Sequence, residues 1–175
     1  MSVTNETLLE RVRNTADHAA WGEFFSIYEP LLLNYVRGRV RVDDPEAPAG
    51  NGRAISVLAA REGAAVACAD LDAEAAAVTA GLVADEGVST VVLQGDVCDA
   101  EVCERFVTET SAALGGLDGV VLNVGIGAGM GLKGTTPEDW DQVFAVNVRS
   151  HFLVARAALP LLEPGSSLVF VSSLA

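Results

Sequence analysis

From residue 50 to the end of the sequence, short apolar runs alternate with stretches that favour helices. The runs of strand length are residues 64–69, 90–93, 119–122 and 168–171. The helical stretches between them are residues 72–85, 99–114 and 136–162. In the last of these, Thr136 can cap the helix and Pro137 suits its first position. Strands separated by helices through short links indicate βαβ units, and therefore a parallel sheet covered by helices.

This pattern lacks a clear strand at its start. Gly50, Asn51 and Gly52 form a glycine turn directly before a helical stretch, and such a unit needs a strand ahead of its turn. The residues available there read "GRVRVDD", in which Arg39 and Arg41 alternate with valines. A central strand is apolar on both faces, and burying an unpaired arginine there costs several kcal/mol. We therefore expect an α/β fold with an incomplete, Rossmann-like, doubly wound parallel sheet.

Composition changes at residues 43–48, "DDPEAP", where two prolines and three acids indicate a linker or an exposed turn. Before this point, aromatic and leucine side chains recur at spacings of three and four, which predicts helices. We therefore expect a small helical segment at residues 1–42, a linker at 43–49 and a partial dinucleotide-binding domain at 50–175.

Charge is distributed unevenly between these parts. Residues 1–42 contain equal numbers of acids and arginines, so the net charge of −13 belongs to the rest of the chain. Such an acidic body repels phosphates, and we expect no nucleic acid partner. No apolar run has the length of a membrane span, and the polar start lacks a signal peptide's apolar stretch, so a cytoplasmic protein that does not bind membranes is expected.

Cysteine and histidine are sparse. Cys68, Cys98 and Cys103 form no CxxC pair and no cluster with histidine, so we expect free thiols and no metal site. His18 and His151 have no ligand spacing, and both are interpreted as surface or packing residues.

Asp70 carries the first chemical indication. It follows an apolar strand about 20 residues after the glycine turn, where a carboxylate accepts hydrogen bonds from the adenosine ribose hydroxyls. Leu71 comes next, with no arginine or lysine beside it to receive a 2′-phosphate. The residues therefore favour NAD over NADP. A glycine turn on its own is a weak signal, and both a plain turn at Gly50 and a simple helix cap at Asp70 stay open as alternatives.

Residues 47–175 resemble a short-chain dehydrogenase/reductase through landmarks that occur in the family's order. These are "GNGRA", "ADLD", "GDVCD", "LNVG", "NVRS" and "VSS". The resemblance implies a cofactor site and part of a catalytic site. The implied cofactor-binding residues are Gly50, Asn51, Gly52, Asp70, Leu71, Asp96, Val97, Asn123, Val124 and Gly125. The implied catalytic residues are Asn147, which supports a proton-relay water, and Ser173, which hydrogen-bonds the substrate oxygen.

The same resemblance implies oxidation of a small-molecule alcohol or reduction of a ketone, but the chain departs from the family's pattern. A tyrosine acid/base and a lysine four residues later should follow Ser173, whereas the tyrosines here are Tyr28 and Tyr35 and the lysine is Lys133. Glu46 also stands where the family's turn has its first glycine. We therefore expect a fragment with impaired catalysis, and the substrate cannot be read from its residues.

Two other functions are weighed against this one. The stretch "LLERVRNTADHAAWGEFFSIYEPLLLNYVRGR" resembles the opening helices of extracytoplasmic-function sigma factors, which implies a regulator that contacts DNA or RNA polymerase. The family's promoter-reading helices are not among these residues. A non-catalytic dimerising module is the other alternative, since the family's long helices pair subunits. The homo-oligomer would then form through the helix at residues 137–162.

Overall fold

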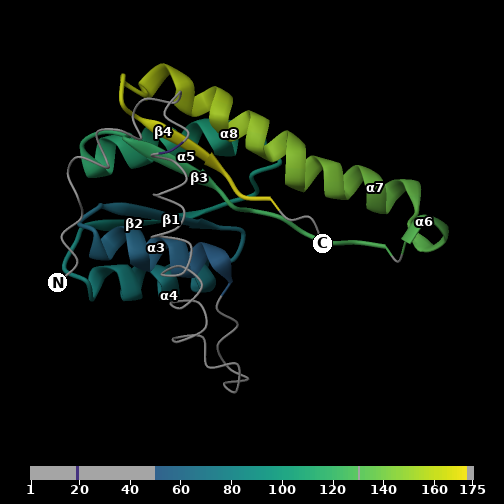
Figure 1. Cartoon of the computed structure of the whole chain (residues 1–175), viewed down its shortest axis with the longest axis horizontal. Helices are drawn as coiled ribbons and strands as arrows, with labels where there is room; N and C mark the ends of the chain where they lie inside the picture. The colour runs from purple at the N-terminus through teal and green to yellow at the C-terminus, as the bar shows by residue number, and fades with distance from the viewer. Residues whose placement is uncertain (1–18, 20–49, 130, 173–175) are drawn as a thin grey trace. The chain divides into compact units, whose positions relative to one another are not determined.

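The computed structural model describes residue 19, residues 50–129 and residues 131–172 (Figure 1). The predictions for the sigma-like segment and the linker lie outside these residues, apart from Ala19. The chain divides into two units, Met1–Ala54 and Ile55–Ala175. The second unit carries the four described strands.

Strands and helices alternate as the sequence predicts. The helices are α3 (Asn51–Arg61), α4 (Ala73–Ala84), α5 (Ala100–Leu114), α6 (Gly131–Gly134), α7 (Pro137–Phe144) and α8 (Ser150–Ala158). A π-helical turn, η1 (Ala145–Arg149), joins α7 to α8, and a 3-10 turn, η2 (Leu159–Leu161), follows α8. The strands are β1 (Val66–Asp70), β2 (Thr90–Gln94), β3 (Gly119–Leu122) and β4 (Ser167–Phe170).

Side-chain caps set where three of the helices begin. The Asp72 carboxylate accepts a hydrogen bond from the Glu74 backbone N–H at 2.8 Å, and Asp99 accepts from the Glu101 N–H at 2.8 Å. At α7, the Thr136 hydroxyl accepts from the Asp139 N–H at 3.1 Å, and the Asp139 carboxylate accepts from the Thr136 N–H at 3.0 Å. This reciprocal pair is a capping box. The cap predicted at Thr136 is therefore confirmed.

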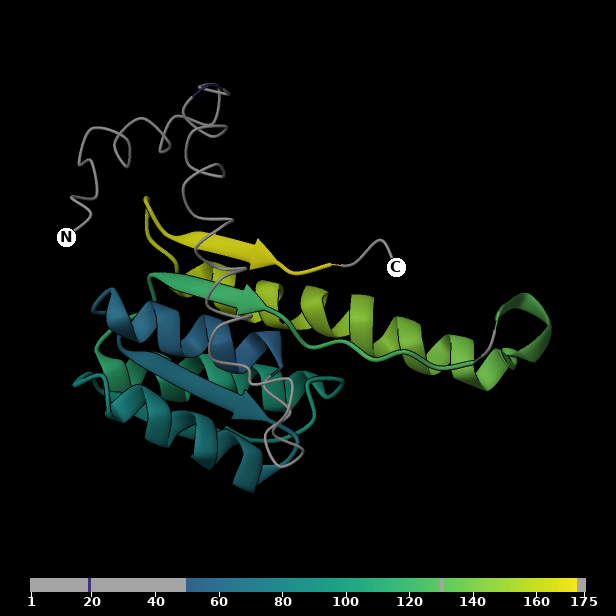
Figure 2. The ribbon, with the colours of Figure 1, turned by 60° about the horizontal axis from the view of Figure 1, so that its bottom comes forward.

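The strands are parallel, but they form two separate pairs. β1 pairs with β2, with Cys68 opposite Val92, and β3 pairs with β4, with Val121 opposite Val169. No described strand joins β1 to β3. Figures 1 and 2 show the order β4, β3, β1 and β2, with the arrows of β1 and β3 pointing the same way. The incomplete parallel sheet expected from the sequence is confirmed, and its interruption falls in the middle.

Helices cover the β1–β2 pair on both faces. On one face Cys68 packs with Ala60 of α3 and with Ala80 and Val83 of α4 in a buried core cluster. On the other face α5 contacts β1 and β2. α5 also packs against α8, which contacts β3. One helical layer therefore spans both strand pairs and holds them in a single unit.

The segment between β3 and α7 is rich in glycine. It includes the short helix α6, whose Gly131 carbonyl accepts hydrogen bonds from the backbone N–H and the hydroxyl of Thr135. Gly129 has a φ of +81°, and a Cβ there would lie 2.2 Å from the Thr135 Oγ1. Both observations require glycine at position 129.

Candidate functional site

The chemically distinctive residues lie where the parallel strands end. Asp70 ends β1, Asp96 and Val97 follow β2, and Asn123 follows β3. Because parallel strands present their carboxyl ends at one edge, these residues share that edge of the Ile55–Ala175 unit. Ser173, predicted as catalytic, comes after β4 and lies outside the described residues.

Asp70 and Leu71 are both exposed at the end of β1. One carboxylate oxygen of Asp70 accepts the Asp72 backbone N–H at 3.0 Å, which orients the group and leaves its other oxygen with no partner among the described residues. Leu71 is 68% exposed. The Gln94 side chain donates to the Leu71 carbonyl at 3.4 Å, linking the ends of β1 and β2. The site therefore offers a carboxylate acceptor beside an apolar side chain.

The turn after β2 has a fixed conformation. The Asp96 carboxylate accepts the Cys98 backbone N–H at 2.8 Å, and the Cys103 thiol donates to the Val97 carbonyl at 3.2 Å. The Arg149 guanidinium donates to the Cys98 carbonyl at 2.7 Å. At Gly95, a Cβ would meet the Val102 side chain at 2.6 Å, so the strand end approaches α5 more closely than any other residue allows. The Cys98 backbone N–H, the Cys103 thiol and the Arg149 guanidinium therefore hold the turn after β2 in place.

Asn147 holds the turn after β3. Its amide oxygen accepts the Ile126 backbone N–H at 2.8 Å, and its amide nitrogen donates to the Ile126 carbonyl at 2.9 Å. The Asn147 side chain thus pairs with both the backbone N–H and the backbone C=O of Ile126, as a residue of a neighbouring strand would. These two bonds fix the position of Ile126. His151, one turn later on the same helix, pairs with the Val124 carbonyl at 2.9 Å, and its ring faces Phe170.

His151 lies in α8, and Asn147 lies in the preceding π-helical turn. Its wider ring brings the Ser150 N–H to the Ala145 carbonyl, five residues back. Such single turns within α-helices occur frequently at functional sites. No local sequence signal marks this turn, and the pairing of Asn147 with Ile126 was not predicted from the sequence.

The three thiols are free, as predicted, and all are poor nucleophiles. Burial raises the pKa of Cys68, and burial followed by the nearby Asp96 raises the pKa of Cys98. Burial is also the main cause that raises the pKa of Cys103 to about 11, with Asp99 adding to it. Thiols held in the protonated form do not serve as catalytic groups near neutral pH.

The glycine turn leads directly into α3. The Gly50 carbonyl accepts the N–H groups of Arg53 and Ala54 at 3.1 and 3.4 Å, so α3 begins as soon as the turn ends. The first turn of α3 contains no acidic residue. The positive dipole end of this helix suits an anion such as a pyrophosphate.

Comparison with known proteins places this arrangement in a family. The sequence profile of the Enoyl-(Acyl carrier protein) reductase family matches residues 47–175. The chain belongs to the short-chain dehydrogenase/reductase family. The match covers all four described strands and the helices between them.

Similar proteins include members with several activities. The chain is 37% identical over 127 residues to General stress protein 39 of Bacillus subtilis, covering 71% of the chain and 44% of that protein. It is 37% identical over 139 residues to (3R)-3-hydroxyacyl-CoA dehydrogenase of Mus musculus, covering 73% and 54%. The structure of a short-chain dehydrogenase/reductase from Serratia marcescens aligns with a TM-score of 0.62 at 29% identity, over 67% of the chain and 48% of that protein. The chain thus spans about half the length of these relatives.

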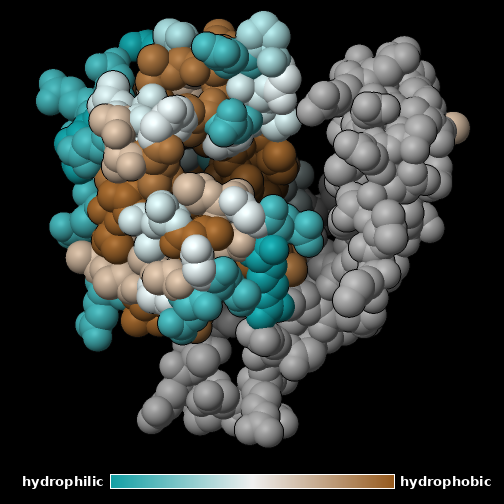
Figure 3. Space-filling view, turned by 90° about the vertical axis from the view of Figure 1, so that its left-hand side faces the viewer, coloured by the Kyte–Doolittle hydropathy of each residue, from teal (hydrophilic) through white to brown (hydrophobic). Residues whose placement is uncertain are grey.

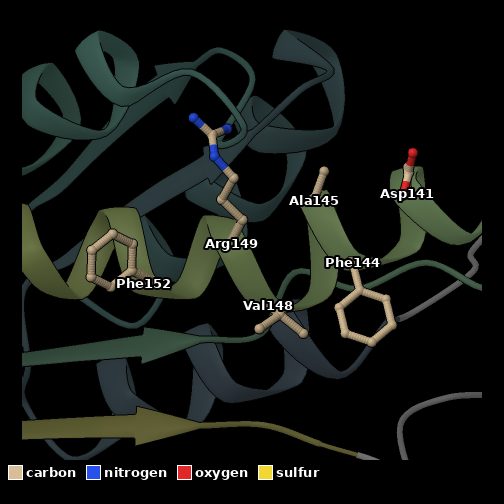
Figure 4. A pocket seen from close by; sticks show the side chains of 6 residues that line it. All are labelled: Asp141, Phe144, Ala145, Val148, Arg149 and Phe152. Carbon is tan, nitrogen blue, oxygen red and sulfur yellow. The ribbon is translucent and has the colours of Figure 1, made fainter.

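One pocket in the described part of this short-chain dehydrogenase/reductase chain lies on a single helix. It is lined by Asp141, Phe144, Ala145, Val148, Arg149 and Phe152, all on the helix that runs from α7 to α8 (Figure 4). Its lining is mostly apolar and open to solvent. Trp140 is also exposed on this helix and stacks on Phe144, with ring centroids 4.6 Å apart. We interpret this surface as a contact face.

None of the described helices is both long and apolar enough to cross a membrane.

Proposed function

We propose that this chain is the cofactor-binding part of an NAD-dependent short-chain oxidoreductase that oxidises an alcohol or reduces a ketone. The observation that carries the proposal is the exposed pair Asp70 and Leu71 at the end of β1. A carboxylate there accepts the two ribose hydroxyls of NAD, whereas the 2′-phosphate of NADP would meet a negative charge and no cation.

The remaining residues fit the chemistry of a dinucleotide. The glycine turn and the start of α3 would take the pyrophosphate, and Asp96 with Val97 would line the adenine. The loop of Asn123, Val124 and Gly125 would border the cofactor, held in place by Asn147. NAD itself supplies the hydride acceptor for alcohol oxidation. The chain's own residues bind and orient it.

Turnover by this chain alone should be very low. Within the family's mechanism, Asn147 and Ser173 would support the proton relay and bind the substrate oxygen, and a tyrosine would move the proton. The chain's tyrosines, Tyr28 and Tyr35, precede the dinucleotide-binding part, and Lys133 lies before α7. General acid–base catalysis contributes about 10²–10⁴-fold, so we propose binding without appreciable catalysis. We place this function in the cytoplasm.

Thermal unfolding with NAD and with NADP tests the proposal. At about a hundred times the dissociation constant, NAD should stabilise the chain by roughly 2.7 kcal/mol. Asp70→Asn removes charge-assisted hydrogen bonds and should weaken NAD binding about tenfold or more. Asp85→Asn is the matched control, because it removes the same charge at the exposed end of α4 and should leave NAD binding unchanged. Leu71→Arg should shift the preference toward NADP. Equal shifts with both cofactors, or none with either, would contradict the proposal.

A homo-oligomer is the second proposal, and an exposed apolar stripe favours it. Trp140, Phe144, Val148 and Phe152 recur every four residues from α7 to α8, and all are exposed. Leu159 continues the exposed apolar surface. The wider π turn between α7 and α8 helps to keep four-residue spacing on one face. A second copy that covers this helix, residues 137–162, would bury the stripe.

Sedimentation measures the oligomeric state of the chain directly. We expect a dimer, and Phe152→Asp should shift it to monomer because a carboxylate would be buried at the interface. Gln142→Asp, an exposed polar position on the same helix, should leave the dimer intact. A strict monomer at the highest concentrations tested would contradict this proposal.

A further inference from the structure

Arg149 links the π-helical turn η1 to the turn after β2. Its guanidinium Nη1 donates to the Cys98 carbonyl at 2.7 Å, although the two residues are 51 positions apart in the sequence. Hydrogen bonds from a charged donor are roughly twice as strong as those between neutral groups. This contact therefore joins two segments of the chain that no local interaction would hold together.

The turn after β2 presents three successive carbonyl groups, and each accepts a hydrogen bond. The Asp96 carbonyl accepts the Asp99 N–H at 3.0 Å, and the Val97 carbonyl accepts the Cys103 thiol at 3.2 Å. The third carbonyl is the one that binds Arg149. The first two donors belong to the turn itself and to α5, which directly follows it. Of these three bonds, only the one from Arg149 fixes the turn to another part of the fold.

Asn147, two residues before Arg149, holds the turn after β3. It binds both backbone groups of Ile126. Residues two apart on a helix do not face the same side, so one helical turn can reach two different loops. Figure 4 shows the Arg149 side chain pointing away from Phe144 and Val148, which lie on the other side of the helix. The single turn η1 thus fixes both of the loops that would border a dinucleotide.

The turn after β2 needs an anchor because it starts at a glycine. Gly95 has more backbone freedom than any other residue type would have there. A Cβ at this position would lie 2.6 Å from the Val102 side chain, which excludes a residue that would stiffen the turn. The bond from Arg149 at the far end of the turn supplies the restraint that the first residue lacks.

We propose that Arg149 is a positioning residue for the adenine half of NAD. The proposal rests on the proposed function, in which Asp96 and Val97 line the adenine. Arg149 acts through the Cys98 carbonyl, without touching the cofactor, and keeps the turn in its binding conformation before NAD arrives. A turn that is already ordered removes the cost of ordering it on binding, so the adenine half binds more tightly.

Separate titrations with the two halves of NAD test the proposal on the full chain. AMP carries the adenine, and nicotinamide mononucleotide is the other half; NMR titration measures both affinities. Arg149→Met removes the guanidinium and keeps an apolar stem, so the affinity for AMP should fall about tenfold. The affinity for nicotinamide mononucleotide should stay the same. A merely structural weakening of the chain would lower both affinities together.

Two further variants separate the position of the charge from its presence. Arg156→Met removes the same charge from an exposed position on α8, where Arg156 lies 3.9 Å from Glu104, and should leave both affinities unchanged. Arg149→Lys keeps a charged donor but loses the planar fork of the guanidinium, so it should give a smaller loss, again for AMP alone. Arg149→Lys keeps the test valid if Arg149→Met does not fold.

Hydrogen exchange without any ligand tests the positioning itself. The Cys98 and Asp99 amides both donate within the turn, to the side chain and the carbonyl of Asp96. Their exchange should become about tenfold faster in Arg149→Met, because the turn opens more often. The Ile126 amide is held by Asn147 and should exchange at an unchanged rate.

The results separate this proposal from the proposed function. If the original chain binds neither mononucleotide, the proposed function fails, and exchange in the turn alone then decides whether Arg149 positions it. Equal losses of both affinities, no loss of either, or unchanged exchange of the Cys98 and Asp99 amides would each overturn the proposal. A loss of AMP affinity alone, together with faster exchange in the turn, would support it.

Discussion

The two strand pairs have similar sequences and quite different surroundings. In the β1–β2 pair, Cys68 and Leu93 are buried and helices cover both faces. In the β3–β4 pair, α8 contacts β3, and Leu122 is buried, but Val121 is 44% exposed and its register partner Val169 is 47% exposed. The comparison teaches that an apolar strand of the right length is not enough for a core. Burial depends on which helices the rest of the chain supplies.

Apolar surface is correspondingly open to solvent on this unit. Figure 3 shows hydrophobic residues exposed across the middle of one face, between polar groups at its rim. The exposed apolar side chains of the strands include Val92, Val121, Val169 and Phe170. Substitutions in the two halves should therefore differ sharply in cost, and the predictions below run from the largest expected effect to the smallest.

Val83→Asp should have the largest effect. Val83 is 0% exposed in the cluster that covers β1, and a carboxylate there has no partner, so we expect a loss of more than about 4 kcal/mol in the free energy of unfolding. Val121→Asp, the matched change in the other half, should cost less than about 1 kcal/mol. Urea unfolding measures both. Equal losses would show that the two halves are equally well packed.

Cys103 should make the covered half sensitive to alkaline pH. Its pKa is raised from 9.0 to about 11, mainly by burial, with Asp99 adding to the effect. Below pH 9 the thiol is protonated in both states, and between pH 9 and about 11 only the unfolded chain releases the proton. Stability should therefore fall by about 2 to 3 kcal/mol across that window, at 1.36 kcal/mol for each pKa unit.

Urea unfolding at several pH values from 8 to 11 checks this. Cys103→Ala should flatten the decline, although it lowers stability at every pH by leaving a small cavity. If stability declines with pH as steeply in Cys103→Ala as in the original chain, the decline comes from titrating groups other than Cys103.

Asn147→Ala should loosen the turn after β3. It removes both hydrogen bonds to Ile126, and we expect a loss of about 2 kcal/mol with faster exchange of the Ile126 amide. Asn147→Asp keeps an acceptor for the Ile126 N–H but loses the donor to its carbonyl, so its loss should be intermediate. A loss from Asn147→Asp as large as that from Asn147→Ala would mean that the acceptor bond contributes little.

Thr136→Ala should have the smallest effect, about 1 kcal/mol, because it removes the cap of α7. Thr108→Ala is the control with the opposite sign. The Thr108 hydroxyl bonds only to backbone carbonyls of its own helix, and alanine is the better helix former, so stability should stay equal or rise slightly. Thermal unfolding compares the two variants, and a similar loss in both would rule out a capping role.

Local signals in the sequence predicted much of the fold. Capping residues such as Asp72, Asp99 and Thr136 act within a few residues of their position, so their helix starts were readable. The apolar runs predicted all four strands to within about two residues, and the arginines at 39 and 41 predicted the gap in the sheet. Asp70 was recognisable as a candidate site residue because it ends a strand.

Features that depend on distant contacts were not predictable. No pattern in "AVNVR" marks the π turn, and the hydrogen bonds of Asn147 and His151 reach residues that lie 21 and 27 positions away in the sequence. Only the structure shows that Trp140 is exposed on the surface of its helix. The interruption between β1 and β3 also needs the crossover directions, which a sequence pattern alone does not give.

The uncovered β3–β4 pair has a consequence for the life of the protein in a cell. Chaperones and proteases recognise short apolar segments that are open to solvent, because unfolded chains display them. Val121 and Val169 stand next to each other on such a surface in the folded state. Quality control should therefore act on the native chain as well as on the unfolded chain, which should raise its rate of degradation and lower its abundance.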